Sequence, residues 1–126
     1  MRKSILYTGG TLNLVLVALH VSFWRMLNWG TELPLLSQMN QAVVQTLNVC
    51  AILVILFFAV ISFIIARRGV TDLNARAILL LVAAFYTTRL VMGWLLFGYS
   101  IPELVIWIVC AGFAAGYGYL AIRRNA

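Results

Sequence analysis

The chain is 126 residues long; 64% of the residues are hydrophobic and only 10% are charged. A soluble domain of this size cannot hide that much apolar surface, because small domains leave a large share of their surface exposed. The composition therefore excludes a soluble globular domain and predicts an all-α integral membrane protein. The net charge of +6 does not indicate nucleic-acid binding, because the basic residues flank apolar runs in small groups and form no continuous basic face.

Four apolar runs follow one another along the chain, and each is about as long as a helix must be to cross a bilayer. The runs cover residues 5–27, 43–66, 75–99 and 101–122. They predict a single domain over residues 1–126, in which four transmembrane helices form an up-down antiparallel bundle. The connection from Gly98 to Pro102 is so short that the third and fourth helices are expected to be antiparallel neighbours.

The first run contains His20, the only histidine of the chain. A lone histidine in a membrane helix more often hydrogen-bonds across a helix interface than binds a metal. A structural zinc site needs four ligands, and a haem held by two histidines would need a second copy of the chain. We therefore expect no metal and no cofactor, while a membrane enzyme or haem protein that relies on His20 stays open as an alternative.

In the second run, Gln41, Gln45 and Asn48 repeat at i, i+4 and i+7, which places them on one stripe of the helix. These amides and His20 all lie toward the connection between the first two runs. The pattern predicts a cluster of polar side chains near one end of the bundle.

The third run carries Arg89, whose guanidinium stays charged even when it is buried. A charge inside a bilayer is costly, so such a residue usually pairs with another group or lines a pathway. Two alternatives stay open. Arg89 either pairs with Glu103 of the fourth run, with Tyr86 stacked on the guanidinium, or anchors a bound anion or lipid headgroup. The candidate ligand-binding residues are His20, Gln45, Asn48, Tyr86, Arg89, Trp94 and Glu103.

The fourth run contains Gly112 and Gly116, which lie one helical turn apart. Small residues at this spacing let two helix backbones approach closely. The glycines therefore predict a helix-packing face, and its partner is either the first helix, near Gly9 and Gly10, or a second copy of the chain.

The distribution of charge predicts the orientation of the helices in the membrane. Seven of the nine basic residues fall on the side that holds both termini: Arg2, Lys3, Arg67, Arg68, Arg76, Arg123 and Arg124. Asp72 is the only acid on that side, and Arg25 is the only basic residue on the other side. Because positive charge is retained in the cytoplasm, we expect both termini there, in the inner membrane of a prokaryote. The basic groups are expected to contact anionic lipid headgroups.

No nucleophile–base pair, no paired carboxylates within a run and no phosphate-binding loop is found in the sequence, so an enzyme is not expected. The favoured interpretation is an accessory or self-associating membrane subunit, which forms a homo-oligomer or joins a larger membrane complex. The alternative is a binding protein or carrier for an anionic or amphiphilic small molecule around Arg89.

Overall fold

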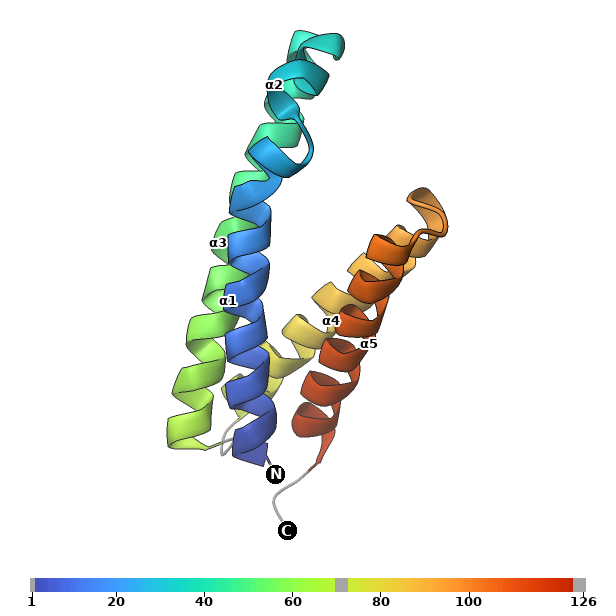
Figure 1. The fold of residues 1–126 in the computed structure, drawn as a ribbon. Helices are drawn as coiled ribbons and strands as arrows, with labels where there is room; N and C mark the ends of the chain where they lie inside the picture. The colour runs from blue at the N-terminus through green and yellow to red at the C-terminus, as the bar shows by residue number, and fades with distance from the viewer. Residues whose placement is uncertain (1, 70–72, 124–126) are drawn as a thin grey trace. The chain divides into compact units, whose positions relative to one another are not determined.

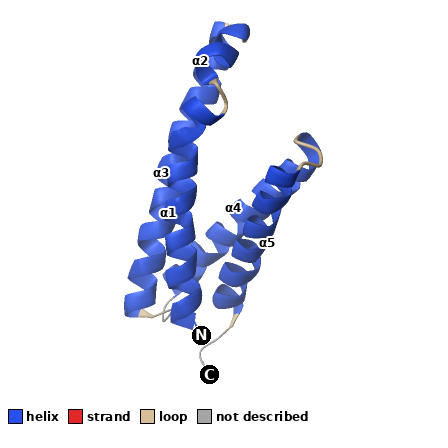
Figure 2. Ribbon diagram, in the orientation of Figure 1, coloured by secondary structure: helices blue, strands red, loops and turns tan. Residues whose placement is uncertain are grey.

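A computed structural model of the chain describes residues 2–69 and 73–123, and it has no strand among them (Figures 1 and 2). The predicted all-helical class is thus confirmed for this part of the chain. The elements are α1 (Arg2–Met26), α2 (Trp29–Glu32), the 3-10 helix η1 (Leu33–Leu35), α3 (Gln38–Arg68), α4 (Leu73–Leu96) and α5 (Ile101–Ile122). Asp72 and Arg124, which enter the charge prediction, lie outside the described residues.

By length and composition, α1, α3, α4 and α5 could each cross a membrane. The predicted run 101–122 coincides with α5, but α3 starts at Gln38, well before the apolar run 43–66. Hydropathy marks the apolar part of a helix and not its ends. Polar residues continue α3 outward, and the Gln41 side chain donates a hydrogen bond to the backbone oxygen of Leu36 at 2.9 Å.

The contacts divide the chain into two compact units. One consists of Met1–Tyr7 and Ile64–Ala126, and the other of Thr8–Phe63. Within each unit the helices can be described from their own contacts. The sequence predicts that all four long helices pack together in one domain. That arrangement would require the two units to pack against each other, and it stays a prediction.

In the unit Thr8–Phe63, α1 and α3 lie side by side and antiparallel (Figure 1). Asn48 Nδ2 donates to the backbone oxygen of His20 at 3.1 Å, near the end that carries the connection. Toward the other end, a Cβ on Gly10 would lie only 2.8 Å from the ring of Phe63. Glycine at this position of α1 therefore leaves room for the Phe63 ring.

The connection between α1 and α3 is ordered by its aromatic side chains. The rings of Trp24 and Trp29 meet edge to face, with their centroids 4.8 Å apart, and Trp29 is buried. Asn28 precedes α2 in the left-handed conformation, with φ of 48°, which asparagine tolerates better than most residues. Gly30 and Pro34 in this connection are typical of a turn, and the structure resolves the turn into α2 and η1.

In the other unit, α4 and α5 form a tight antiparallel hairpin (Figure 1). Tyr86 of α4 packs on Phe113 of α5, with ring centroids 4.3 Å apart. Arg76 Nε donates to the backbone oxygen of Ala121 at 2.8 Å, which satisfies one of the carbonyls left open at the end of α5. Gly98 turns the chain with φ of 66°, a conformation that favours glycine.

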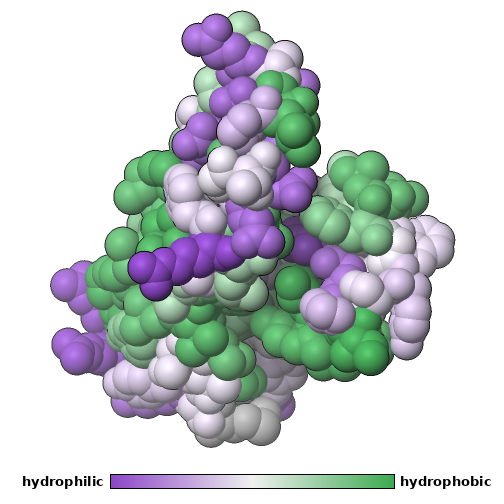
Figure 3. Space-filling view, turned by 45° about the horizontal axis from the view of Figure 1, so that its top comes forward, coloured by the Kyte–Doolittle hydropathy of each residue, from purple (hydrophilic) through white to green (hydrophobic). Residues whose placement is uncertain are grey.

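Large hydrophobic side chains remain exposed on every long helix. Figure 3 shows hydrophobic residues over much of the face that it presents. Such residues include Val15 on α1, Leu53 on α3, Leu81 on α4 and Ile108 on α5, each more than half exposed. Exposed hydrophobic residues that recur along every long helix are typical of a surface that meets lipid or another protein.

Candidate functional site

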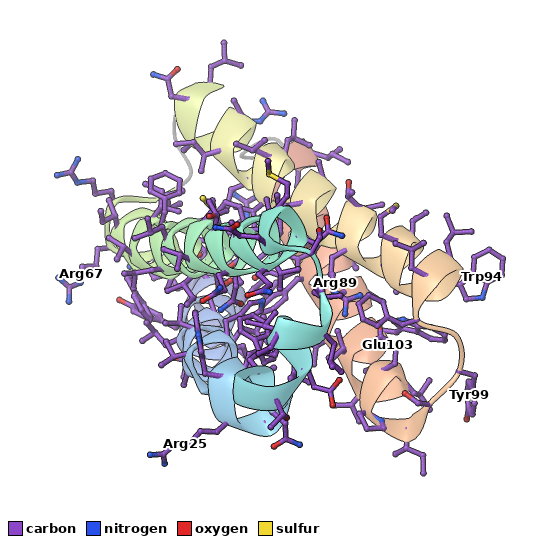
Figure 4. The ribbon with its side chains drawn as sticks, turned by 90° about the horizontal axis from the view of Figure 1, so that it is seen from above. Arg25, Arg67, Arg89, Trp94, Tyr99 and Glu103 are labelled. Carbon is purple, nitrogen blue, oxygen red and sulfur yellow. The ribbon has the colours of Figure 1, made fainter. Side chains whose placement is uncertain are left out.

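The main polar feature of the α4–α5 hairpin is an ion pair between Arg89 and Glu103 (Figure 4). Arg89 Nη1 donates to Glu103 Oε1 at 2.9 Å, and Arg89 Nη2 donates to Oε2 at 3.3 Å. The two planar groups therefore meet in the bidentate geometry that gives arginine–carboxylate pairs their strength. Of the two alternatives for Arg89, the ion pair with Glu103 is present.

Residues of α5 hold the carboxylate in place. Trp107, one turn after Glu103, donates its Nε1–H to Oε1 at 2.9 Å. Ser100 caps the helix by accepting a hydrogen bond from the Glu103 backbone N–H at 3.3 Å. Ser100 and Glu103 have the spacing of a capping box, in which the acid would normally reach back to the cap. Here the carboxylate instead points toward α4 and Arg89.

Gly93 of α4 provides the space for the pair. It lies one turn after Arg89 and is buried. A Cβ at this position would lie 2.5 Å from Glu103 Oε1 and 2.9 Å from Trp107 Nε1, and it would collide with Arg89 Nη1. Any side chain here would displace the groups that form the ion pair.

The aromatic ring over the guanidinium differs from the one expected. The Phe97 ring lies over Arg89, with 5.0 Å between its centroid and Cζ, a cation–π arrangement. The sequence predicts Tyr86 in this role, but the Tyr86 ring contacts Phe85 and Phe113 in the hairpin core. Tyr86 lies one turn before Arg89, whereas the arginine side chain extends toward the end of the hairpin that carries Phe97.

The two charged groups differ in how far they are exposed. The Arg89 side chain is 31% exposed, whereas that of Glu103 is 7% exposed. Among the described residues, the Arg89 guanidinium donates hydrogen bonds only to the two carboxylate oxygens of Glu103. A guanidinium has five N–H donors, so others remain available. The cluster is neutral as a pair, yet it presents its positive member to its surroundings.

Trp94, another candidate, does not point at the pair. Its side chain is 68% exposed, and Figure 4 shows it directed outward from α4, as Tyr99 is from the connection to α5. Both rings lie near the end of the hairpin that holds the ion pair. They can contact a molecule that covers this end, but neither helps to coordinate Arg89.

The remaining ligand candidates lie in the other unit. His20 Nδ1 lies 2.9 Å from the backbone oxygen of Leu16, so its proton has a partner within α1. Asn48 links α3 to α1 through the His20 oxygen, and Gln45 donates to the Gln41 oxygen at 3.2 Å. These groups stabilise helices and their pairing. A combined pocket with Arg89 stays a prediction.

The two glycines of the predicted packing face have different surroundings. A Cβ on Gly116 would lie 3.3 Å from Ile5 Cγ2, so this glycine faces the start of α1. A Cβ on Gly112 would meet no atom within 4 Å. Gly116 thus lies against Ile5 of α1, whereas the surface at Gly112 is open. Packing of this face near Gly9 and Gly10, or on a second copy of the chain, stays a prediction.

Gly93, Phe97 and Trp107 belong to the site but are absent from the residues expected from the sequence. A signal for two of them is present in the spacing. Gly93 lies four residues after Arg89, and Trp107 lies four residues after Glu103, so each shares a helix face with a charged residue. In the described residues, no group of three or more His, Cys, Asp or Glu side chains is placed to hold a metal ion.

No protein-family model, curated protein or solved structure matches this chain. The chemistry of the site follows from its own geometry. That geometry is a fixed cation with a buried counter-ion, which can join two helices or bind an oxyanion.

Proposed function

We propose that this chain is an integral membrane protein whose four long helices cross the bilayer and which acts as a self-associating or accessory subunit. The length and apolar character of the helices support insertion. Their exposed hydrophobic residues also support it, because lipid is the solvent in which such a surface is stable. Among the described residues, every buried side-chain nitrogen or oxygen atom has a hydrogen-bond partner, as a bilayer interior requires.

The proposed orientation places both termini in the cytoplasm of a prokaryote. It rests on Arg2, Lys3, Arg67, Arg68 and Arg123, which lie at the helix ends expected on that side. There they can also contact anionic headgroups. Glu32 lies at the opposite end of α1, in the connection to α3, and is expected to be outside.

Labelling of introduced cysteines tests this orientation. In a background that carries Cys50→Ser and Cys110→Ser, a membrane-impermeant maleimide applied to intact cells should label Glu32→Cys. It should label Lys3→Cys only after the cells are permeabilised, because the inner membrane then no longer shields that position. Labelling of Lys3→Cys, and not of Glu32→Cys, in intact cells would invert the proposed topology.

The position of the ion pair supports a structural role for Arg89. By sequence, Arg89 is expected near the middle of its span, where a charge is most costly. Its guanidinium, however, reaches Glu103 in the first turn of α5, close to the end of the hairpin. Arginine side chains in membrane helices extend toward the membrane–water interface in this way. Pairing with Glu103 further reduces the free-energy cost of placing the charge in the membrane. The pair therefore needs no catalytic task to explain it.

The observation that carries the proposal of self-association is an exposed stripe on α5. Its residues follow one another at alternating steps of four and three, the heptad spacing of helices that pack along a seam. We call the stripe the α5 seam; it consists of Ile101, Val105, Ile108, Gly112, Ala115, Tyr119 and Ile122, all exposed. Gly112 and Ala115 lie at its centre, where small side chains allow the backbone of a second helix to approach. A second copy of the chain is the occupant that we propose.

Substitution of Gly112 tests this association. Gly112→Leu should lower the association constant by about tenfold or more, because a large side chain at the centre keeps the second backbone away. Energy transfer between labelled copies in liposomes measures the association. Ala84→Leu is the matched control, since Ala84 is also exposed within a long helix but lies on α4. Equal association of the wild type and Gly112→Leu would refute this use of α5.

Gly116→Leu separates packing within the chain from packing between copies. The new side chain would press on Ile5, so it should lower the thermal stability of the chain. Association per folded chain should change less than it does in Gly112→Leu.

One observation favours a second candidate function, the binding of an anionic amphiphile. The Arg89 side chain keeps 31% of its surface exposed and has N–H donors in addition to those that Glu103 uses. A purely structural ion pair does not require this exposure.

A further inference from the structure

We propose that Arg89, clamped by Glu103, binds a phosphate oxyanion at the end of the α4–α5 hairpin, with an anionic phospholipid as its favoured source. This inference rests on the membrane location proposed above. It goes beyond that proposal by naming the ligand chemistry of the site and the residues that prepare it.

The first argument is the unequal exposure of the two charges. In the pair, 31% of the arginine side chain is exposed but only 7% of the glutamate side chain. The arginine is therefore the more accessible charge of the pair, while the carboxylate is buried. The planar fork of arginine matches the oxygens of phosphate, and such charge-assisted hydrogen bonds are strong.

The second argument is that the cation is held in place before any ligand arrives. Glu103 is fixed by Trp107 Nε1, and the arginine is fixed by Glu103 and by the Phe97 ring. Gly93 leaves room for these side chains, and a Cβ at position 93 would collide with them. Because the arginine is already ordered, a ligand does not have to order it on binding, which favours affinity.

The third argument concerns the surroundings of the cation. Phe97 is 66% exposed, Trp94 68% and Tyr99 77%, and all three lie near the end of the hairpin where α5 begins. Tryptophan and tyrosine collect at the level of lipid headgroups. A cation at that level, bordered by exposed aromatic rings, fits a molecule with both a phosphate and acyl chains.

The charges of the hairpin also favour an anionic headgroup over a zwitterionic one. Glu103 is the only acidic residue of α4 and α5, and its side chain is buried. A choline group next to the bound phosphate would therefore find no carboxylate on the hairpin. Phosphatidylglycerol, which carries a phosphate without a cationic group, is the better match.

The test uses the full-length protein in nanodiscs of equal parts phosphatidylglycerol and phosphatidylcholine, with bound lipids counted by native mass spectrometry. The wild type should retain one more phosphatidylglycerol per chain than Arg89→Gln does. The occupancy of that lipid should fall by about tenfold in the variant, the change that corresponds to roughly 1.4 kcal/mol. Arg25→Gln, which removes the one basic residue expected on the outer side of the membrane, should leave this occupancy unchanged. Equal retention by the wild type and Arg89→Gln would overturn the proposal.

Glu103→Gln distinguishes binding from a structural effect of the pair. Glutamine keeps the size of the side chain and an oxygen for Trp107, but it no longer neutralises Arg89. If Arg89 binds phosphate, this variant should retain at least as much phosphatidylglycerol as the wild type. If the pair matters only for folding, retention should fall as in Arg89→Gln, and the proposal would be wrong. This comparison decides the matter even if Arg89→Gln does not fold.

A final arm identifies the source of the phosphate. Inorganic phosphate at millimolar concentration is added to the wild-type nanodiscs. If the Arg89-dependent phosphatidylglycerol is unaffected, a lipid is the ligand; if it is displaced, the site serves soluble phosphate compounds. If the wild type binds no phosphatidylglycerol that depends on Arg89 but still associates through the α5 seam, this inference alone is overturned. The proposed subunit role would then still stand.

Discussion

Gly93→Ala is expected to disrupt the Arg89–Glu103 pair although it adds only one methyl group. The new Cβ would lie 2.5 Å from Glu103 Oε1 and 2.9 Å from Trp107 Nε1. The polar groups must therefore move apart, and we expect the free energy of unfolding to fall by about 1–3 kcal/mol, the usual cost of overfilling a packed site. Reversible unfolding in mixed micelles measures this change. The sign is informative, because alanine in place of glycine within a helix normally stabilises it by roughly 0.5–1 kcal/mol.

Gly118→Ala provides the matched control for this experiment. Gly118 lies within α5, and a Cβ there would lie 3.9 Å from the Cβ of Ala83, an ordinary contact. This variant should be neutral or slightly stabilised, because it gains helix propensity without a collision. If both variants behave alike, Gly93 does not provide space for the ion pair, and the description of the site would have to change.

The helices of this chain are largely predictable from its sequence, because apolar runs of this length have few other stable conformations in lipid. The predicted helix bounds agree best with the observed ones where capping residues mark the same helix end as the hydropathy does. Ser100 caps α5 and Pro102 occupies its first turn, so the predicted and observed bounds coincide. The predicted and observed bounds differ most at α3, because Gln38 and Gln41 continue the helix without adding to the apolar run.

The candidate site was only partly predictable. The pairing of Arg89 with Glu103 follows from the tight connection between α4 and α5, which limits the acids that the arginine can reach. The ring over the guanidinium could not be predicted, because the choice between Tyr86 and Phe97 depends on which way the arginine side chain extends. Hydropathy also treats Gly93 as an ordinary apolar position. Its role depends on three side chains that converge on it, two of them from another helix.

A double-mutant cycle on the ion pair is expected to show strong coupling and unequal single effects. Arg89→Met leaves the Glu103 carboxylate unpaired at 7% exposure, so it should approach the cost of about 3–5 kcal/mol for breaking a buried pair. Glu103→Gln leaves the arginine unpaired, but with 31% of its side chain exposed the arginine has partial access to solvent. We therefore expect Glu103→Gln to cost less than Arg89→Met.

The double variant Arg89→Met/Glu103→Gln should recover most of the stability lost in Arg89→Met, because no unpaired charge remains and the glutamine oxygen can still accept the Trp107 N–H. The coupling energy should reach about 3 kcal/mol, the upper end of the range for residues in direct contact. All four proteins are to be unfolded in neutral detergent free of phosphate and anionic lipid, since a bound oxyanion would compensate for the missing carboxylate in Glu103→Gln. Additive single effects would mean that the pair contributes no net stability. In that case the exposed face of Arg89, and with it ligand binding, would be the better explanation for a charge at this position.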